Sequence, residues 1–101
     1  MIDNRVTWLV NEVNDLLNVS NVGLYEFLWL LRGRQPTIEE TDMSRIASDA
    51  LNQLLMEKSV KLILLTWANQ DSEGDFDISK LSASDWNDPS SDAQYVAVAR
   101  I

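Results

Sequence analysis

Two missing residue types limit the chemistry that this sequence can perform. The chain contains neither histidine nor cysteine. Histidine is the residue most used for acid–base catalysis near neutral pH, and cysteine supplies thiolate nucleophiles, thiolate metal ligands and disulfides. Only carboxylates, lysine, tyrosine and serine remain, and no spacing singles out a catalytic pair among them. We therefore expect no enzymatic activity, no bound metal and no cofactor.

The densest group of possible metal ligands lies in the acidic segment 69–80. With Asn69 as the first position of an EF-hand loop, oxygen ligands fall at several of the expected positions, and Gly74 falls where the loop turns sharply. The twelfth position, which requires a bidentate glutamate, is Lys80, and the preceding sequence predicts a strand instead of an entering helix. We favour a solvated acidic turn, with calcium binding as the alternative.

Glu26 is the one carboxylate placed within a strongly apolar run. The run, 23–33, contains seven large apolar or aromatic residues between two glycines. Burial would raise the pKa of Glu26, as at many functional sites. We favour a simpler interpretation, in which Glu26 lies at the wet edge of a helix or pairs with an arginine.

Three segments predict helices. Apolar residues recur every three or four positions in the first segment, from about residue 4 to 17, and in the third, which ends near Glu57. The run 23–33 is apolar on nearly every side, which predicts a central helix inside the core, with Trp29 and Leu30 as its most exposed large residues.

Capping residues predict where the second and third of these helices begin and where the second ends. Asn21 is the expected cap of the central helix, and Gly33 is its expected C-terminal residue with positive φ. Thr37 and Glu40 match a capping box before the third helix, and Thr41 offers a second possible start.

Two β-rich segments predict antiparallel pairing near the C-terminus. Residues 60–67 are apolar on both faces, and residues 95–101 are rich in valine and alanine. Between them lies an acidic excursion, 69–93, which is long enough to need local structure. We expect Ile78, Leu81 and Trp86 to fold back over the outer face of the hairpin. The prediction is a single α+β domain, residues 1–101, with a three-helix core followed by a two-stranded antiparallel β-hairpin.

This order of elements resembles that of a winged-helix domain. The junction from Leu54 to Leu62 (Leu-Leu-Met-Glu-Lys-Ser-Val-Lys-Leu) is similar to the end of that family's recognition helix. In winged-helix proteins that bind DNA, the third helix enters the major groove and the hairpin tip contacts the backbone. The resemblance implies these roles for the third helix and for the acidic excursion of this chain.

The charge of the chain argues for a protein partner instead of DNA. Sixteen acidic and eight basic residues give a net charge of −8, and most of the excess follows residue 36. Acidic side chains at the third helix and the hairpin tip repel phosphates, so we expect little binding to nucleic acid without a basic partner. The candidate partner-binding residues are Asp71, Glu73, Asp75, Asp77, Trp86, Arg45 and Asp49.

The expected function is therefore that of a small acidic interaction domain of bacterial type: an inhibitor, an immunity-like protein or a regulatory subunit that binds a basic protein surface. The alternative is a winged-helix transcriptional regulator that binds DNA as a dimer, and a homodimer is compatible with either function. No run of apolar residues approaches the length of a membrane span, and the first residues lack the order of a signal peptide. We expect a cytoplasmic protein with no membrane partner.

Overall fold

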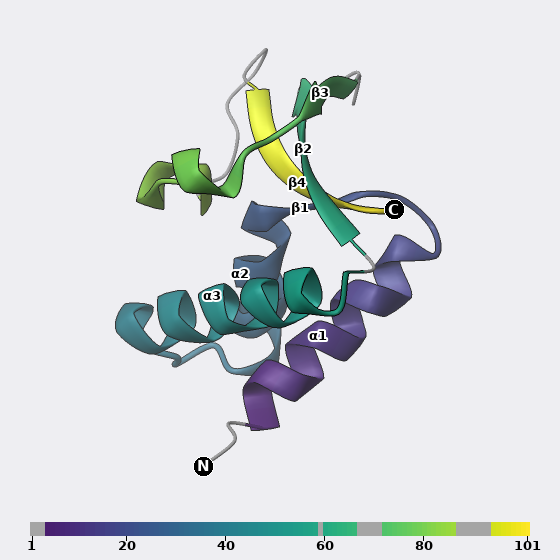
Figure 1. Cartoon of the computed structure of the whole chain (residues 1–101). Helices are drawn as coiled ribbons and strands as arrows, with labels where there is room; N and C mark the ends of the chain where they lie inside the picture. The colour runs from purple at the N-terminus through teal and green to yellow at the C-terminus, as the bar shows by residue number, and fades with distance from the viewer. Residues whose placement is uncertain (1–3, 59, 67–71, 87–93) are drawn as a thin grey trace.

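A layer of helices packs against one face of an antiparallel β-sheet (Figure 1). The computed structural model describes residues 4–58, 60–66, 72–86 and 94–101. In chain order the elements are α1 (Asn4–Leu17), β1 (Val22–Gly23), α2 (Leu24–Arg34), α3 (Glu40–Met56), β2 (Val60–Thr66), β3 (Ser72–Asp75), the 3-10 turns η1 (Ile78–Lys80) and η2 (Ala83–Trp86), and β4 (Gln94–Arg100). Within the described residues, no helix is both long and apolar enough to cross a bilayer.

Within the described residues, the sheet contains four strands in the order β1-β4-β2-β3, all antiparallel. The predicted pairing of the two long strands is confirmed, with Val60 opposite Arg100 and Thr66 opposite Gln94. The prediction of only two strands is wrong. A short strand pairs with each outer edge of the two long strands, because each edge carries backbone N–H and C=O groups that require hydrogen-bond partners.

The two short strands differ in how they join the sheet. In β1, Val22 pairs with Val98 immediately before α2 begins. In β3, Gly74 pairs with Leu64, next to a shift in register. The φ of Gly74 is +108°, a conformation that glycine adopts without strain.

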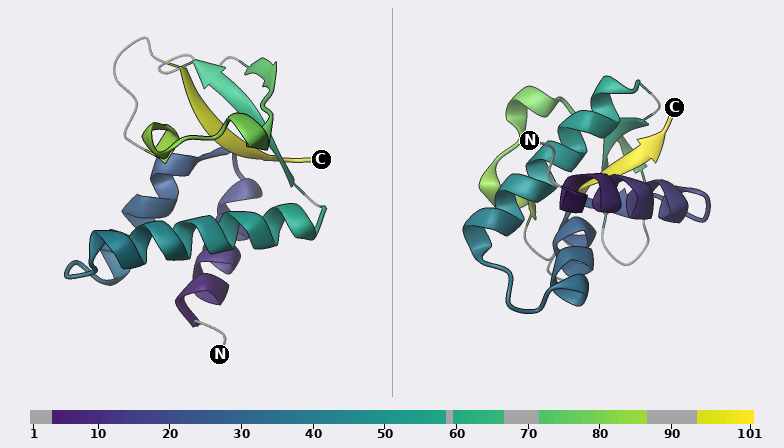
Figure 2. Two further views of the ribbon diagram at one scale, coloured as in Figure 1. Left: turned by 60° about the vertical axis from the view of Figure 1, so that its left-hand side comes forward. Right: turned by 90° about the horizontal axis from the view of Figure 1, so that it is seen from below.

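The core lies between the helices and the inner face of the sheet, and α2 is at its centre. All three helices contribute fully buried side chains, and β4 closes the core from the sheet side. The least exposed large residues are Phe27, Leu9, Leu24, Leu31, Ile46, Leu51, Leu54, Val13, Val22, Val96 and Val98. Figure 2 shows α1 and α3 crossing beneath the sheet, with α2 beside them. The prediction that this helix lies in the core is confirmed for one face, which contains Leu24, Phe27 and Leu31. Trp29 is exposed as expected, at 48%, whereas Leu30 is half-buried against the core.

The outer face of the sheet carries a second, smaller apolar cluster. Ile63 and Leu65 of β2 lie beside Tyr95 and Ala97 of β4, and all four side chains are buried. Tyr25 of α2 joins this cluster and meets the ring of Tyr95 edge-to-face, with centroids 5.6 Å apart. Both faces of the two long strands are therefore apolar and buried, as their sequence predicts.

Three predicted helix ends are wrong. The N-cap of α2 is Gly23 and not Asn21, because β1 intervenes. The helix then continues through Gly33 to Arg34, so Gly33 is a helical residue without positive φ. The N-cap of α3 is Glu39, so Thr37 does not form the expected box.

The excursion between β2 and β4 also differs from the prediction. Leu81 and Trp86 were expected over the outer face of the hairpin, but they pack against the main core on the helical side. Ile78 is not folded back over the hairpin's outer face and is 46% exposed. Trp86 is held on the helical side by Phe27 of the central helix, which it meets edge-to-face with ring centroids 5.8 Å apart.

Replacing Gly23 with alanine should destabilise the protein by about 1–3 kcal/mol. A Cβ at this position would overlap the ring of Tyr25 and crowd that of Tyr95. Moving Tyr25 would disturb the aromatic contacts on the outer face of the sheet. Urea denaturation at equilibrium measures the change in the free energy of unfolding.

Gly33→Ala is the matched control for this substitution. Gly33 lies in the exposed last turn of α2, and no atom within 4 Å would meet an added Cβ. Alanine there should be neutral or stabilising by up to about 1 kcal/mol, because it favours the helix. Equal effects of the two substitutions would contradict the packing role of Gly23.

Candidate interaction surfaces

Two of the predicted acidic partner-binding residues have local partners. The carboxylate of Asp75 forms an ion pair with the Nζ of Lys61, at 3.0 Å, across β3 and β2. Asp77 accepts a hydrogen bond from the backbone N–H of Ser79, at 2.9 Å, at the start of η1. This hydrogen bond lowers the pKa of Asp77, so its carboxylate stays charged. Both residues thus have local partners within the fold and also add negative charge to its surface.

The remaining acids of the excursion are less informative. Glu73 lies within β3. Asp71 falls outside the described residues. In the described part of the chain, no three acidic side chains come together in a group that could hold a metal ion. The described acids of the excursion therefore provide no preorganised cation site.

On α3, Arg45 and Asp49 are brought together. The guanidinium of Arg45 lies 3.9 Å from the carboxylate of Asp49 and 3.6 Å from that of Asp42. All three side chains are about half exposed, so these pairs contribute little to stability. Their consequence is electrostatic: the positive charge of Arg45 is offset by two acids on the exposed face of α3.

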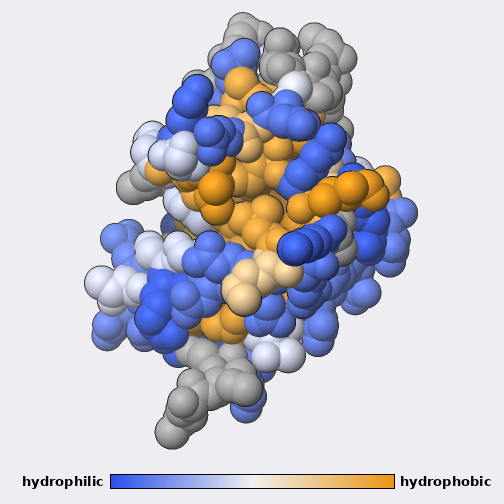
Figure 3. All heavy atoms as spheres, viewed as in Figure 1, coloured by the Kyte–Doolittle hydropathy of each residue, from blue (hydrophilic) through white to orange (hydrophobic). Residues whose placement is uncertain are grey.

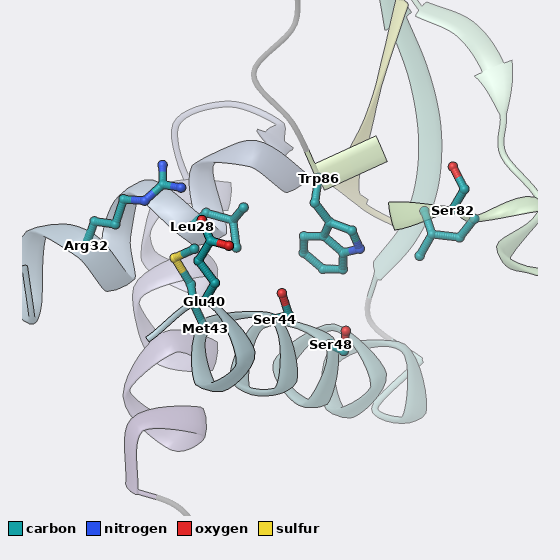
Figure 4. Close-up of a pocket in the computed structure, with 9 residues that line it drawn as sticks. Leu28, Arg32, Glu40, Met43, Ser44, Ser48, Ser82 and Trp86 are labelled. Atoms are coloured by element: carbon teal, nitrogen blue, oxygen red, sulfur yellow. The ribbon is translucent and has the colours of Figure 1, made fainter. Parts of the chain in front are cut away.

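Trp86 forms one wall of a cleft between α2, α3 and η2. Its ring is half-buried and meets Phe27 edge-to-face. The cleft has a volume of about 560 Å³ and is lined by Leu28, Arg32, Glu40, Met43, Ser44, Ser48, Leu81, Ser82 and Trp86. In Figure 4 the indole points toward the serines of α3, while Arg32 and Glu40 lie beside Leu28. Trp86 is thus anchored to the core and accessible at the same time.

A second hollow, which we call the apolar groove, lies where α3 ends beside β2. It has a volume of about 710 Å³ and is lined by Asn52, Leu55, Met56, Val60, Lys61, Leu62, Phe76, Asp77 and Ile78. Met56 is 80% exposed, which is unusual for a large apolar side chain beside other apolar residues. On the face drawn in Figure 3, apolar side chains gather between the sheet and α3. Of the site residues predicted from the sequence, only Asp77 lines this groove, and the apolar residues that form it were not among them.

Glu26 lies at the start of α2, half-buried. Its carboxylate accepts a hydrogen bond from the backbone N–H of Gly23, at 2.6 Å, and so caps the helix. Burial raises the pKa of Glu26, and the hydrogen bond opposes this effect only in part. Burial, together with the charge of Glu26, also raises the pKa of Tyr95. The expected arginine partner is absent among the described residues, and helix capping explains the position of this carboxylate.

Comparison with known proteins assigns the chain to no family. No protein-family model, curated protein or solved structure matches it. Any assignment of function therefore depends on the geometry and charge of the surfaces described above.

Glu26→Gln should change how stability depends on pH. Because the pKa of Glu26 is raised above its ordinary value of 4.5, the folded state binds this proton more tightly than the unfolded chain does. The stabilisation from that proton is complete at pH values below the pKa that Glu26 has in the unfolded chain. It is lost as the pH rises through the higher pKa that Glu26 has in the folded protein. Glutamine does not titrate and still accepts the hydrogen bond from Gly23.

The free energy of unfolding of the glutamine variant should therefore rise relative to wild type as pH increases from about 4 toward neutral. Urea titrations at a series of pH values measure this difference. The other acidic residues are the same in both proteins, so their contributions to the pH dependence cancel in the difference between the two free energies of unfolding. A difference that stays constant with pH would show that the pKa of Glu26 is the same in the folded and unfolded states.

Proposed function

We propose that the chain is a small acidic protein-interaction domain, of winged-helix type, that binds a positively charged partner surface and performs no catalysis. The apolar groove is the observation that carries this proposal. Met56 and Ile78 expose much of their side chains there, next to the partly buried Leu55 and Phe76. Exposed apolar side chains in a hollow are typical of an interface, because a partner removes them from water.

The shape of the groove suits an anchoring side chain from a partner. One wall comes from the last turns of α3, and the other from β2 and the segment Phe76–Ile78. Methionine is flexible and polarisable, so Met56 can adapt its packing to the group that enters. Each wall belongs to regular structure or to a turn fixed by backbone hydrogen bonds, such as that from Phe76 N–H to the carbonyl oxygen of Leu62.

Charge determines which partner is favoured. At a net charge of −8, two copies of the chain repel one another, whereas a basic protein is attracted. Within the groove itself, Lys61 is offset by Asp75, and the carboxylate of Asp77 stays charged. A partner segment that combines an apolar anchor with positive charge fits both features. The partner that we propose is therefore the basic surface of another protein, for which this chain serves as an inhibitor, an immunity-like protein or a regulatory subunit.

The winged-helix assignment is supported by the order of the elements and by the junction after α3. The chain runs from α3 through Lys58, at a φ of 58°, directly into β2, which pairs with β4. The third helix would face DNA in the alternative function. Here α3 begins with acidic residues, and its one cation, Arg45, lies beside Asp42 and Asp49. This arrangement favours a protein partner over DNA.

A photo-crosslinking residue placed at position 56 tests the proposal in cells that express the protein. We expect cross-links to one basic protein, identified by mass spectrometry. The same residue at position 19 is the matched control, because Val19 is 87% exposed and does not line the groove. Identical products from positions 56 and 19, or no basic protein among them, would contradict the proposal.

Ile78→Asp should weaken binding to that partner by about tenfold or more, because it places a charge where an apolar anchor is buried. Val19→Asp adds the same charge elsewhere and should leave the affinity nearly unchanged. Biolayer interferometry at two salt concentrations measures both effects. Wild-type affinity should also fall as salt rises, since opposite charges steer the encounter.

A further inference from the structure

Two oppositely charged, solvent-exposed side chains line the cleft between α2, α3 and η2. Arg32 comes from the last turn of α2, and Glu40 is the first residue of α3. Both line the cleft, and within the described residues neither side chain forms a hydrogen bond or an ion pair. A guanidinium and a carboxylate are therefore available to the same ligand.

The rest of the cleft is suited to an apolar group. Leu28 and Met43 lie beside the charged pair, and the indole of Trp86 lies across the cleft, above the hydroxyls of Ser44 and Ser48 (Figure 4). Trp86 is held in place by its contact with Phe27. A volume of about 560 Å³ lies within the usual range for small-molecule sites.

These features together select the class of ligand. A simple anion bound to Arg32 would be repelled by Glu40, and a simple cation bound to Glu40 would be repelled by Arg32. A neutral apolar molecule would remove water from both charges without replacing it. A zwitterion satisfies both side chains, through charge-assisted hydrogen bonds to each.

We propose that this cleft binds a free α-amino acid with an aromatic or large apolar side chain. Arg32 receives the carboxylate and Glu40 the ammonium group, while the side chain packs between Met43 and Trp86. This site shares no lining residue with the apolar groove, which lies at the other end of α3. The inference therefore stands independently of the protein partner.

Calorimetric titration of the full chain with three related molecules at neutral pH tests the proposal. L-phenylalanine should bind with a Kd of about 1 mM or lower, as expected for a ligand of this size. 3-Phenylpropionate lacks the ammonium group and 2-phenylethylamine lacks the carboxylate, so each should bind at least about tenfold more weakly. Absence of phenylalanine binding at about 10 mM, or equal binding of all three, would overturn the proposal.

Substitutions locate the site. Arg32→Gln and Glu40→Gln should each weaken phenylalanine binding about tenfold or more. Arg34→Gln and Glu39→Gln are matched controls, because Arg34 lies over the ring of Trp8 and neither residue lines the cleft. Circular dichroism verifies that all four variants are folded. Equal losses in the variants and their controls would show that overall charge, and not this cleft, accounts for binding.

The groove variant Ile78→Asp separates this inference from the proposed function. It should bind phenylalanine as wild type does, because Ile78 lies outside the cleft. Loss of phenylalanine binding in this variant would overturn the placement of the ligand.

Discussion

Burial of α2 is the interaction on which the rest of the structure depends. Leu24, Phe27 and Leu31 are almost fully buried, and burying each such side chain contributes about 1.5–3 kcal/mol. This helix meets α1, α3 and the sheet, and β1, which directly precedes it, fixes its start to β4. The contact between Phe27 and Trp86 then attaches the excursion to the same helix. α2 thus lines the cleft directly, through Leu28 and Arg32, whereas the groove is lined by α3, β2 and the segment Phe76–Ile78.

The parts of the fold that were predictable are those with a clear local pattern. Apolar spacing is sufficient for the three helices, and β-rich composition for the two long strands, because each signal lies within one continuous segment. The two short strands carry no such signal. β1 has only two residues, and Ser-Glu-Gly-Asp in β3 has low β-propensity, so both form because the long strands offer open edges. Gly33 likewise shows that a local signal can be insufficient, because a glycine near the end of a helix does not always terminate the helix.

The candidate surfaces were less predictable from the sequence, because they depend on contacts between segments that are far apart in the chain. Acidic residues and a tryptophan in a polar segment are visible in composition, but their partners are not. The pairing of Asp75 with Lys61, or of Trp86 with Phe27, depends on segments that are distant in sequence. The apolar groove was missed because Leu55, Phe76 and Ile78 look like core residues, and only the fold decides which of them stay exposed. Met56 was the one available signal, because it falls outside the spacing of three and four residues that predicts the buried face of the third helix, Met43, Ile46, Ala47, Ala50, Leu51 and Leu54.

The groove and the cleft are linked by the chain between Phe76 and Trp86. Its first residues line the groove, its last residues line the cleft, and α3 supplies the facing wall of both. The segment contains only two short 3-10 turns, which rarely persist without anchors. One anchor is the hydrogen bond from Phe76 to Leu62, and the other is the contact of Trp86 with Phe27. The width of each hollow is therefore set by the sheet at one end of the segment and by α2 at the other.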